Sequence, residues 1–121
     1  EELNDYKIMC FNGKAKCTFV CSNRGSSSGL NIDIYDIDWN LMPVQRPGSP
    51  NSGMHTKKPK NYTQMIRYAE ILAENNKFLR VDFYEINNQL YFGELTFYPN
   101  SGFKGFEPRE YDELFGDWIE L

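Results

Sequence analysis

The chain has little of the side-chain chemistry on which most catalytic and metal centres depend. Histidine occurs once, at His55, in an irregular stretch without partners for a Ser-His-Asp triad or a histidine metal centre. The three cysteines, Cys10, Cys17 and Cys21, form neither an even disulfide set nor a Cys-x-x-Cys motif. We therefore interpret them as free, buried thiols, which indicates a reducing compartment and a cytoplasmic protein.

Long hydrophobic runs and an excess of positive charge are also missing. No stretch approaches the roughly 18 apolar residues of a membrane span, and no secretory signal opens the chain. The formal net charge is −4, which argues against a sequence-independent nucleic-acid surface. We expect a protein with no transmembrane segment that does not bind nucleic acid.

Turn residues and hydrophobic periodicity divide the 121 residues into short strands and one clear helix. The expected elements are a hairpin over residues 5–22, a strand over 31–37, a helix of about 14 residues from Tyr62, strands over 78–86 and 90–97, and a short helix opened by Pro108. This order predicts an α+β fold: a mainly antiparallel sheet made of two hairpins and a further strand, packed with one main helix and a short C-terminal helix.

The first hairpin predicts where the thiols lie. Asn12-Gly13 is typical of a type I′ turn, which pairs Cys10 with Ala15 and Ile8 with Cys17. All three cysteines then share one apolar face, and we expect them to be buried against the helix that starts at Tyr62.

The second hairpin carries two carboxylates, Asp82 and Glu94. A three-residue loop at 87–89 makes them direct cross-strand partners, with Arg80 opposite Thr96. A two-residue loop instead sends Glu94 to the other face, so the separation of polar and apolar faces favours the longer loop. Like charges in direct opposition repel, and a divalent cation with oxygen ligands removes that penalty. The alternative is a pair of exposed carboxylates that only solvate the sheet.

Several segments resemble a known family. Arg80-Val81-Asp82-Phe83, followed after a turn by Phe92-Gly93-Glu94-Leu95-Thr96-Phe97-Tyr98-Pro99, resembles the metal- and phosphate-binding end of ATP-grasp ligases. Three stretches in the same order are similar to the TupA-like branch, which acts in teichuronopeptide and surface-polysaccharide biosynthesis. They are Asp5-Tyr6-Lys7 to Lys14, Tyr35-Asp36-Ile37-Asp38-Trp39-Asn40, and Gly93 to Phe103.

The resemblance implies ATP and Mg²⁺ as cofactors. On the matched positions Asp82 and Glu94 would hold Mg²⁺, and Arg80 would neutralise the transferring γ-phosphate. Thr96 stands where the superfamily usually has Asn, so its hydroxyl would be a third ligand through water.

Two further residues are candidate nucleotide contacts. Lys7 lies on the polar face of its strand, where it either reaches a phosphate or is simply exposed. Asp38 lies on a loop that the resemblance turns toward the nucleotide or the acceptor.

We expect residues 1–121 to form a single domain, the C-terminal lobe of a longer ATP-grasp protein whose N-terminal lobe is its partner. The whole protein would be an ATP-dependent carboxylate ligase acting on a saccharide or peptide acceptor, and the isolated 121-residue piece would be inactive. Two alternatives stay open: a glycosyltransferase-associated component, with Asp36-Ile37-Asp38 as an Asp-x-Asp site, and a non-catalytic interaction module, which the Thr96 departure supports.

Overall fold

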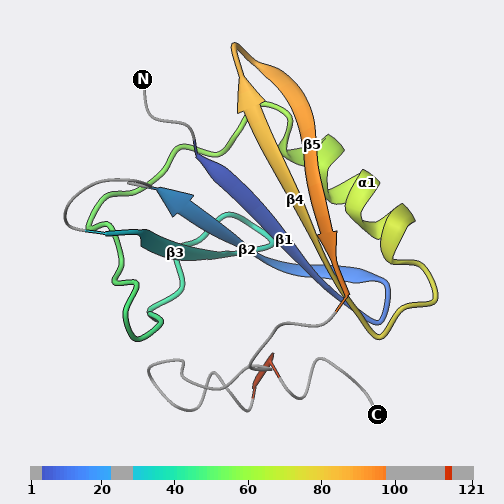
Figure 1. Cartoon of the computed structure of the whole chain (residues 1–121), viewed down its shortest axis with the longest axis horizontal. Helices are drawn as coiled ribbons and strands as arrows, with labels where there is room; N and C mark the ends of the chain where they lie inside the picture. Colours follow the sequence, from blue (N-terminus) through green and yellow to red (C-terminus); the bar gives the residue numbers. More distant parts are fainter. Residues whose placement is uncertain (1–3, 23–28, 98–113, 116–121) are drawn as a thin grey trace.

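A computed structural model describes residues 4–22, 29–97 and 114–115 as a five-stranded antiparallel sheet with one helix against it (Figure 1). The strands follow the order β3-β2-β1-β4-β5 across the sheet. The elements are β1 (Asp5–Phe11), β2 (Lys14–Ser22), β3 (Asn31–Asp36), α1 (Tyr62–Ala73), β4 (Phe78–Ile86) and β5 (Gln89–Thr96). The α+β class is confirmed. The expected C-terminal helix lies outside the described residues, apart from Leu114 and Phe115.

The β1–β2 hairpin closes with the expected turn, but its register changes along the strands. Asn12 and Gly13 both have positive φ, 52° and 81°, as a type I′ turn requires. Cys10 pairs with Ala15 as predicted, yet a bulge between Met9 and Cys10 makes Met9 the partner of Cys17. The predicted Ile8–Cys17 pair is therefore wrong, because the bulge adds one residue to β2 and shifts every later pair.

The bulge also separates the cysteines. Cys10 packs in the core on the α1 face, whereas Cys17 and Cys21 pack in a second core on the opposite face. All three are free and buried, as expected. The prediction that all three lie against the helix is wrong, because one extra residue reverses the in–out alternation of a strand.

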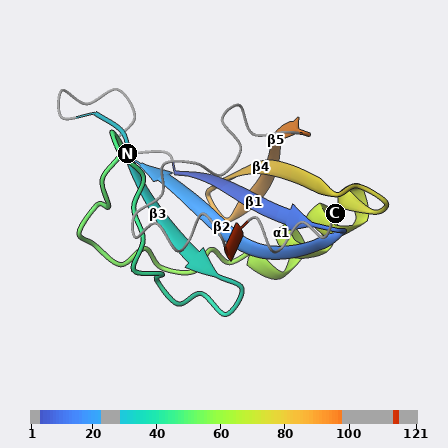
Figure 2. The same cartoon turned by 90° about the horizontal axis from the view of Figure 1, so that it is seen from below.

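Each face of the sheet has its own hydrophobic core. On one face α1 packs against β1, β2 and β4, as Figures 1 and 2 show. The fully buried side chains there include Ile8, Val20, Met65, Leu79 and Val81. On the opposite face Phe11, Phe19, Ile34, Val44 and Phe115 form the second core.

Helix α1 presents a narrow apolar stripe to the sheet. Its buried residues are Tyr62, Met65, Ala69 and Ala73, at the three- and four-residue spacing of one helical face. The helix has 12 residues, and no helix of the described residues is long and apolar enough to cross a membrane.

Asn61 precedes α1 but its side chain does not cap the helix. Its amide instead donates to Glu85 Oε2 at 3.0 Å and to the carbonyl of Asn88 at 2.8 Å. The residue therefore ties the start of α1 to the β4–β5 hairpin.

The segment after β3 is held on the sheet by an aromatic cluster. The Trp39 ring stacks on Tyr35 with centroids 4.3 Å apart and planes 7° apart, and it meets Tyr62 edge-on at 5.0 Å. Trp39 Nε1 donates to the carbonyl of Thr56 at 2.8 Å, and Thr56 N donates to the Tyr35 hydroxyl at 2.7 Å. Trp39 keeps a left-handed backbone, φ 65°, because these contacts fix it.

We expect stability to fall in alkaline solution because burial raises the pKa of several thiols and phenols, among them Cys10 and Tyr62. Burial raises the pKa of Cys10 from 9.0 to about 12 and that of Tyr62 from 10.0 to about 12. The unfolded chain releases these protons first, so their contribution is complete below about pH 9 and is lost as the pH rises toward 12, with a slope of about 1.4 kcal/mol per pH unit for each group.

Urea unfolding between pH 8 and 11 under reducing conditions measures this loss. Tyr62→Phe is the matched variant and should show a shallower decline between pH 10 and 11. An unfolding free energy that stays constant over this range would contradict the burial of both groups.

Candidate functional site

The β4–β5 hairpin closes with two residues rather than three. Asn87 and Asn88 have φ of 51° and 66°, and Ile86 pairs with Gln89. Asparagine tolerates this left-handed conformation, and two such residues in succession form the type I′ turn that suits the strand twist. The predicted three-residue loop at 87–89 is wrong.

A bulge in β5 then changes the register before it reaches the charged residues. Phe83 pairs with Phe92, but Val81 pairs with Leu95, so β5 carries one extra residue opposite Asp82. The predicted Arg80–Thr96 pair is confirmed. The prediction of Asp82 and Glu94 as direct partners is wrong, because Asp82 falls within the irregular part of the ladder.

Glycine at position 93 allows this bulge. A Cβ atom there would lie 2.9 Å from Cε2 of Tyr84 and 3.1 Å from the carbonyl oxygen of Asp82. A larger residue would therefore push the Tyr84 ring and the β4 backbone away from β5. Gly93 thus permits the close approach that brings Glu94 to the same side as Arg80, 3.7 Å between Nη2 and Oε1.

Four charged side chains meet on β1 and β4, on the face opposite α1. Lys7 and Asp82 are register partners, and Lys7 Nζ lies 2.7 Å from Asp82 Oδ2 and 2.9 Å from Asp5 Oδ2. Arg80 donates to the same carboxylate, with Nε 3.0 Å from Oδ1 and Nη2 3.2 Å from Oδ2. We call Asp5, Lys7, Arg80 and Asp82 the charged cluster; Glu94 lies at its edge.

The members of the cluster differ in their access to solvent. Asp5 and Asp82 are 1% and 2% exposed, and the side chain of Lys7 is 15% exposed. Burial alone lowers the pKa of Lys7, but its hydrogen bonds to Asp82 and Asp5 outweigh that effect and the pKa is raised. Lys7 is therefore a cation at neutral pH. The Glu94 side chain is 66% exposed and remains open to solvent.

Asp38 lies away from this cluster. It is in the turn after β3, where its backbone N–H donates to Asp36 Oδ1 at 3.0 Å. Asp36 is level with Arg80 in the sheet but three strands away, roughly 14 Å at the usual strand spacing. The structure thus brings Lys7, Arg80, Asp82 and Glu94 together, with Thr96 opposite Arg80, but not Asp38.

Asp5 is the member that the sequence analysis missed. Asp5 and Lys7 alternate on β1 and so share one face, and β1 runs beside β4 with Lys7 opposite Asp82. The alternation was visible in the sequence, but the pairing of β1 with β4 was not.

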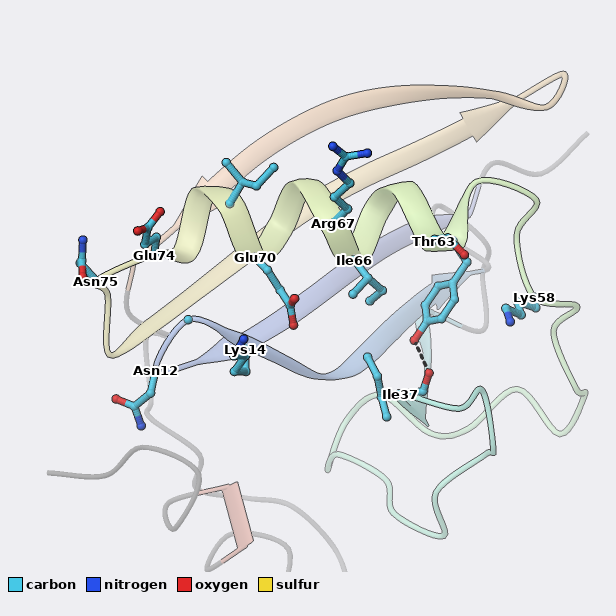
Figure 3. A pocket seen from close by; sticks show the side chains of 13 residues that line it. Asn12, Lys14, Ile37, Lys58, Thr63, Ile66, Arg67, Glu70, Glu74 and Asn75 are labelled. Atoms are coloured by element: carbon cyan, nitrogen blue, oxygen red, sulfur yellow. Dashed lines mark hydrogen bonds between the residues drawn. The ribbon is translucent and has the colours of Figure 1, made fainter.

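Two of the hollows in the described part of the surface lie apart from the cluster. The larger, of about 870 Å³, lies between α1 and the β1–β2 hairpin (Figure 3). In it Glu70 points toward Lys14, and Glu70 Oε2 accepts a hydrogen bond from the backbone N–H of Ala15 at 2.9 Å. The smaller, of about 360 Å³, is apolar and lies between α1 and β5. No residue of the charged cluster lines either hollow.

The family model for the TupA-like ATPgrasp proteins matches residues 1–120. The chain belongs to the TupA-like ATP-grasp family. Membership indicates the general ATP-grasp function, with a nucleotide as partner. Searches of curated proteins and of solved structures gave no match.

The charged cluster of this TupA-like chain does not fit Mg²⁺ on Asp82 as the residues are arranged. Both oxygens of Asp82 are already held, by Lys7 and by Arg80. Among the residues that the structure describes, no group of three or more His, Cys, Asp or Glu side chains converges as a metal site. A divalent ion would have to displace two cations from a buried carboxylate, and their charges oppose its approach.

Proposed function

We propose that this chain forms the phosphate-binding lobe of an ATP-dependent carboxylate ligase in cell-surface polysaccharide biosynthesis. The observation that carries the proposal is the fixing of two cations, Lys7 and Arg80, on one face of the sheet by the buried carboxylate of Asp82. Family membership supports the nucleotide as ligand. The proposal includes a cytoplasmic protein, a saccharide or peptide acceptor, and a partner lobe that precedes these residues and completes the nucleotide site.

The reaction of such a ligase begins with phosphoryl transfer. An oxygen of the substrate carboxylate attacks the γ-phosphorus of ATP, the bond to the β-phosphate oxygen breaks, and ADP leaves. An amine then attacks the acyl phosphate and releases phosphate. Negative charge grows on the leaving oxygen and is spread over the transferring group, so fixed donors directed at those oxygens lower the barrier.

Arg80 is suited to this task. Asp82 holds Nε and Nη2 of its guanidinium, which fixes the plane of the group, and Arg80 has further N–H donors for phosphoryl oxygens. Lys7 adds a second positive charge on the neighbouring strand. Glu94 and Thr96 are candidate contacts for a metal that accompanies ATP. Asp82 has no part in this metal contact, because Lys7 and Arg80 hold both of its oxygens.

The test uses the full-length protein with ATP, Mg²⁺ and pooled carboxylate and amine acceptors, and follows ADP release. Arg80→Lys should lower ADP release at least about 100-fold, because a point charge cannot replace the planar guanidinium fork. Arg67→Lys is the matched control, since Arg67 lies on α1 outside the charged cluster and should keep full activity.

Equal ADP release by the protein and its Arg80→Lys variant would contradict the assignment of Arg80. Turnover of a sugar nucleotide without ADP release would favour the glycosyltransferase alternative. The described structure gives that alternative little support, because Asp36 Oδ1 is already an acceptor for the backbone N–H groups of Asp38 and Asn40.

A non-catalytic interaction module is the second candidate. The observation in its favour is the charge balance of the cluster, in which each cation is already paired with a buried carboxylate. This candidate predicts no ADP release from the full-length protein with any acceptor.

A further inference from the structure

The ammonium group of Lys7 bridges two buried carboxylates. Its nitrogen lies 2.7 Å from Asp82 Oδ2 and 2.9 Å from Asp5 Oδ2, so one oxygen of each carboxylate faces the same positive charge. Lys7 reaches this position from the strand between β2 and β4, at the centre of the sheet. A cation placed between two carboxylate oxygens is the arrangement that a hard divalent ion would otherwise provide.

The two carboxylates need a cation in this place. Both residues are at most 2% exposed, and burying like charges together is costly unless an opposite charge lies between them. Arg80 serves the other side of Asp82, with its Nε on Oδ1. The ammonium of Lys7 is therefore the counter-ion that Asp5 and Asp82 share.

We infer that Lys7 is the resident cation of this site and takes the place of a divalent metal ion on Asp82. Asp82 is then a positioning residue for Lys7 and Arg80 and not a metal ligand in this chain. The inference depends on the proposed function in one respect: the divalent metal ion that Lys7 replaces is the ion expected to accompany ATP. Because the lysine is covalently attached, the site keeps its positive charge at any metal concentration.

Manganese titration of the full-length protein without nucleotide tests this inference. Lys7→Ala removes the ammonium and leaves room for an ion with its water ligands between Asp5 and Asp82. We expect this variant to bind Mn²⁺ at least about tenfold more tightly than the unaltered protein, as measured by calorimetry or by the paramagnetic signal of free Mn²⁺. Sites elsewhere in the protein would appear equally in both titrations.

Two matched variants separate the site from general electrostatics. Lys7→Met removes the same charge but fills the space with an apolar side chain, so it should not gain Mn²⁺ affinity. Adding Asp82→Asn to Lys7→Ala should abolish the gain, because it removes one of the two carboxyl groups that face the ion. Equal gains in Lys7→Ala and Lys7→Met, or no gain in Lys7→Ala, would overturn the inference.

The unaltered protein provides a measurement that does not depend on the folding of a lysine variant. With Lys7 intact, Asp82→Asn should change the Mn²⁺ affinity less than about twofold. A loss of affinity of about tenfold or more would show that Asp82 is a metal ligand. If Lys7→Ala is unfolded without metal, recovery of the native circular dichroism spectrum with Mn²⁺ supports the inference.

The titration and the ADP assay fail independently. Mn²⁺ binding without nucleotide does not require turnover, so a protein without ligase activity can still show the gain in Lys7→Ala. Conversely, the ligase could be active while Asp82→Asn alone weakens its Mn²⁺ binding about tenfold or more. The proposed function would then hold and the inference would fail.

Discussion

Asp82→Leu should destabilise the fold by about 3 kcal/mol, because it leaves two cations beside a side chain that no longer neutralises them. The carboxylate is almost fully buried and lies between Lys7 and Arg80. Lys7 keeps some contact with water, which places the expected loss at the lower end of the range for broken buried pairs. Urea unfolding at pH 7 measures the effect.

A double-mutant cycle with Lys7→Met isolates the pair. The double variant Lys7→Met/Asp82→Leu should cost clearly less than the two single changes together, because it leaves neither partner of the pair behind. Additivity within about 0.5 kcal/mol would show that Lys7 and Asp82 do not stabilise each other. Arg67→Met, on the solvent side of α1, is a control for the loss of one surface cation.

Trp39→Ala should also cost about 3 kcal/mol or more, because it empties the centre of the aromatic cluster on the α1 face. The indole contacts Tyr35, Tyr62 and Tyr6, and its N–H holds the carbonyl of Thr56. Thermal or urea unfolding followed by tyrosine fluorescence measures the loss.

Met54→Ala is the control for this prediction. Met54 lies in the same segment between β3 and α1, but its side chain is 74% exposed. Its loss should therefore change the unfolding free energy by less than about 0.5 kcal/mol. A Trp39→Ala protein as stable as Met54→Ala would show that the cluster does not hold this segment.

Local signals in the sequence predict most of the fold. Asn12-Gly13 specifies a hairpin by itself, and the periodic spacing of apolar residues after Tyr62 specifies a helix. The two bulges are not predictable in this way. Each depends on how one strand meets its neighbour, as at Gly93, where the fit of the Tyr84 ring decides the spacing.

The candidate site likewise contains residues that the sequence predicts and residues that only the strand pairing reveals. Arg80, Asp82 and Glu94 follow from the composition of one hairpin, and the structure keeps them on one side of the sheet. Asp5 was missed because its role depends on the pairing of β1 with β4, which are separated by more than half of the chain. Asp38 was predicted as a nucleotide contact because its loop resembles the family, but the sequence does not specify where that loop lies in the fold.

The pairing of β1 with β4 also determines when the charged cluster can form during folding. Lys7 and Asp82 are 75 residues apart in the sequence, so the first and fourth strands must meet before the lysine has its counter-charge. Closing so long a loop is slow compared with forming either hairpin. Sliding β1 by one residue would turn Lys7 into the hydrophobic core under α1 and Ile8 toward the carboxylates. A misaligned central strand therefore lacks the contacts that hold the cations and is less stable. We expect the sheet to reach its correct register and the cluster to form together.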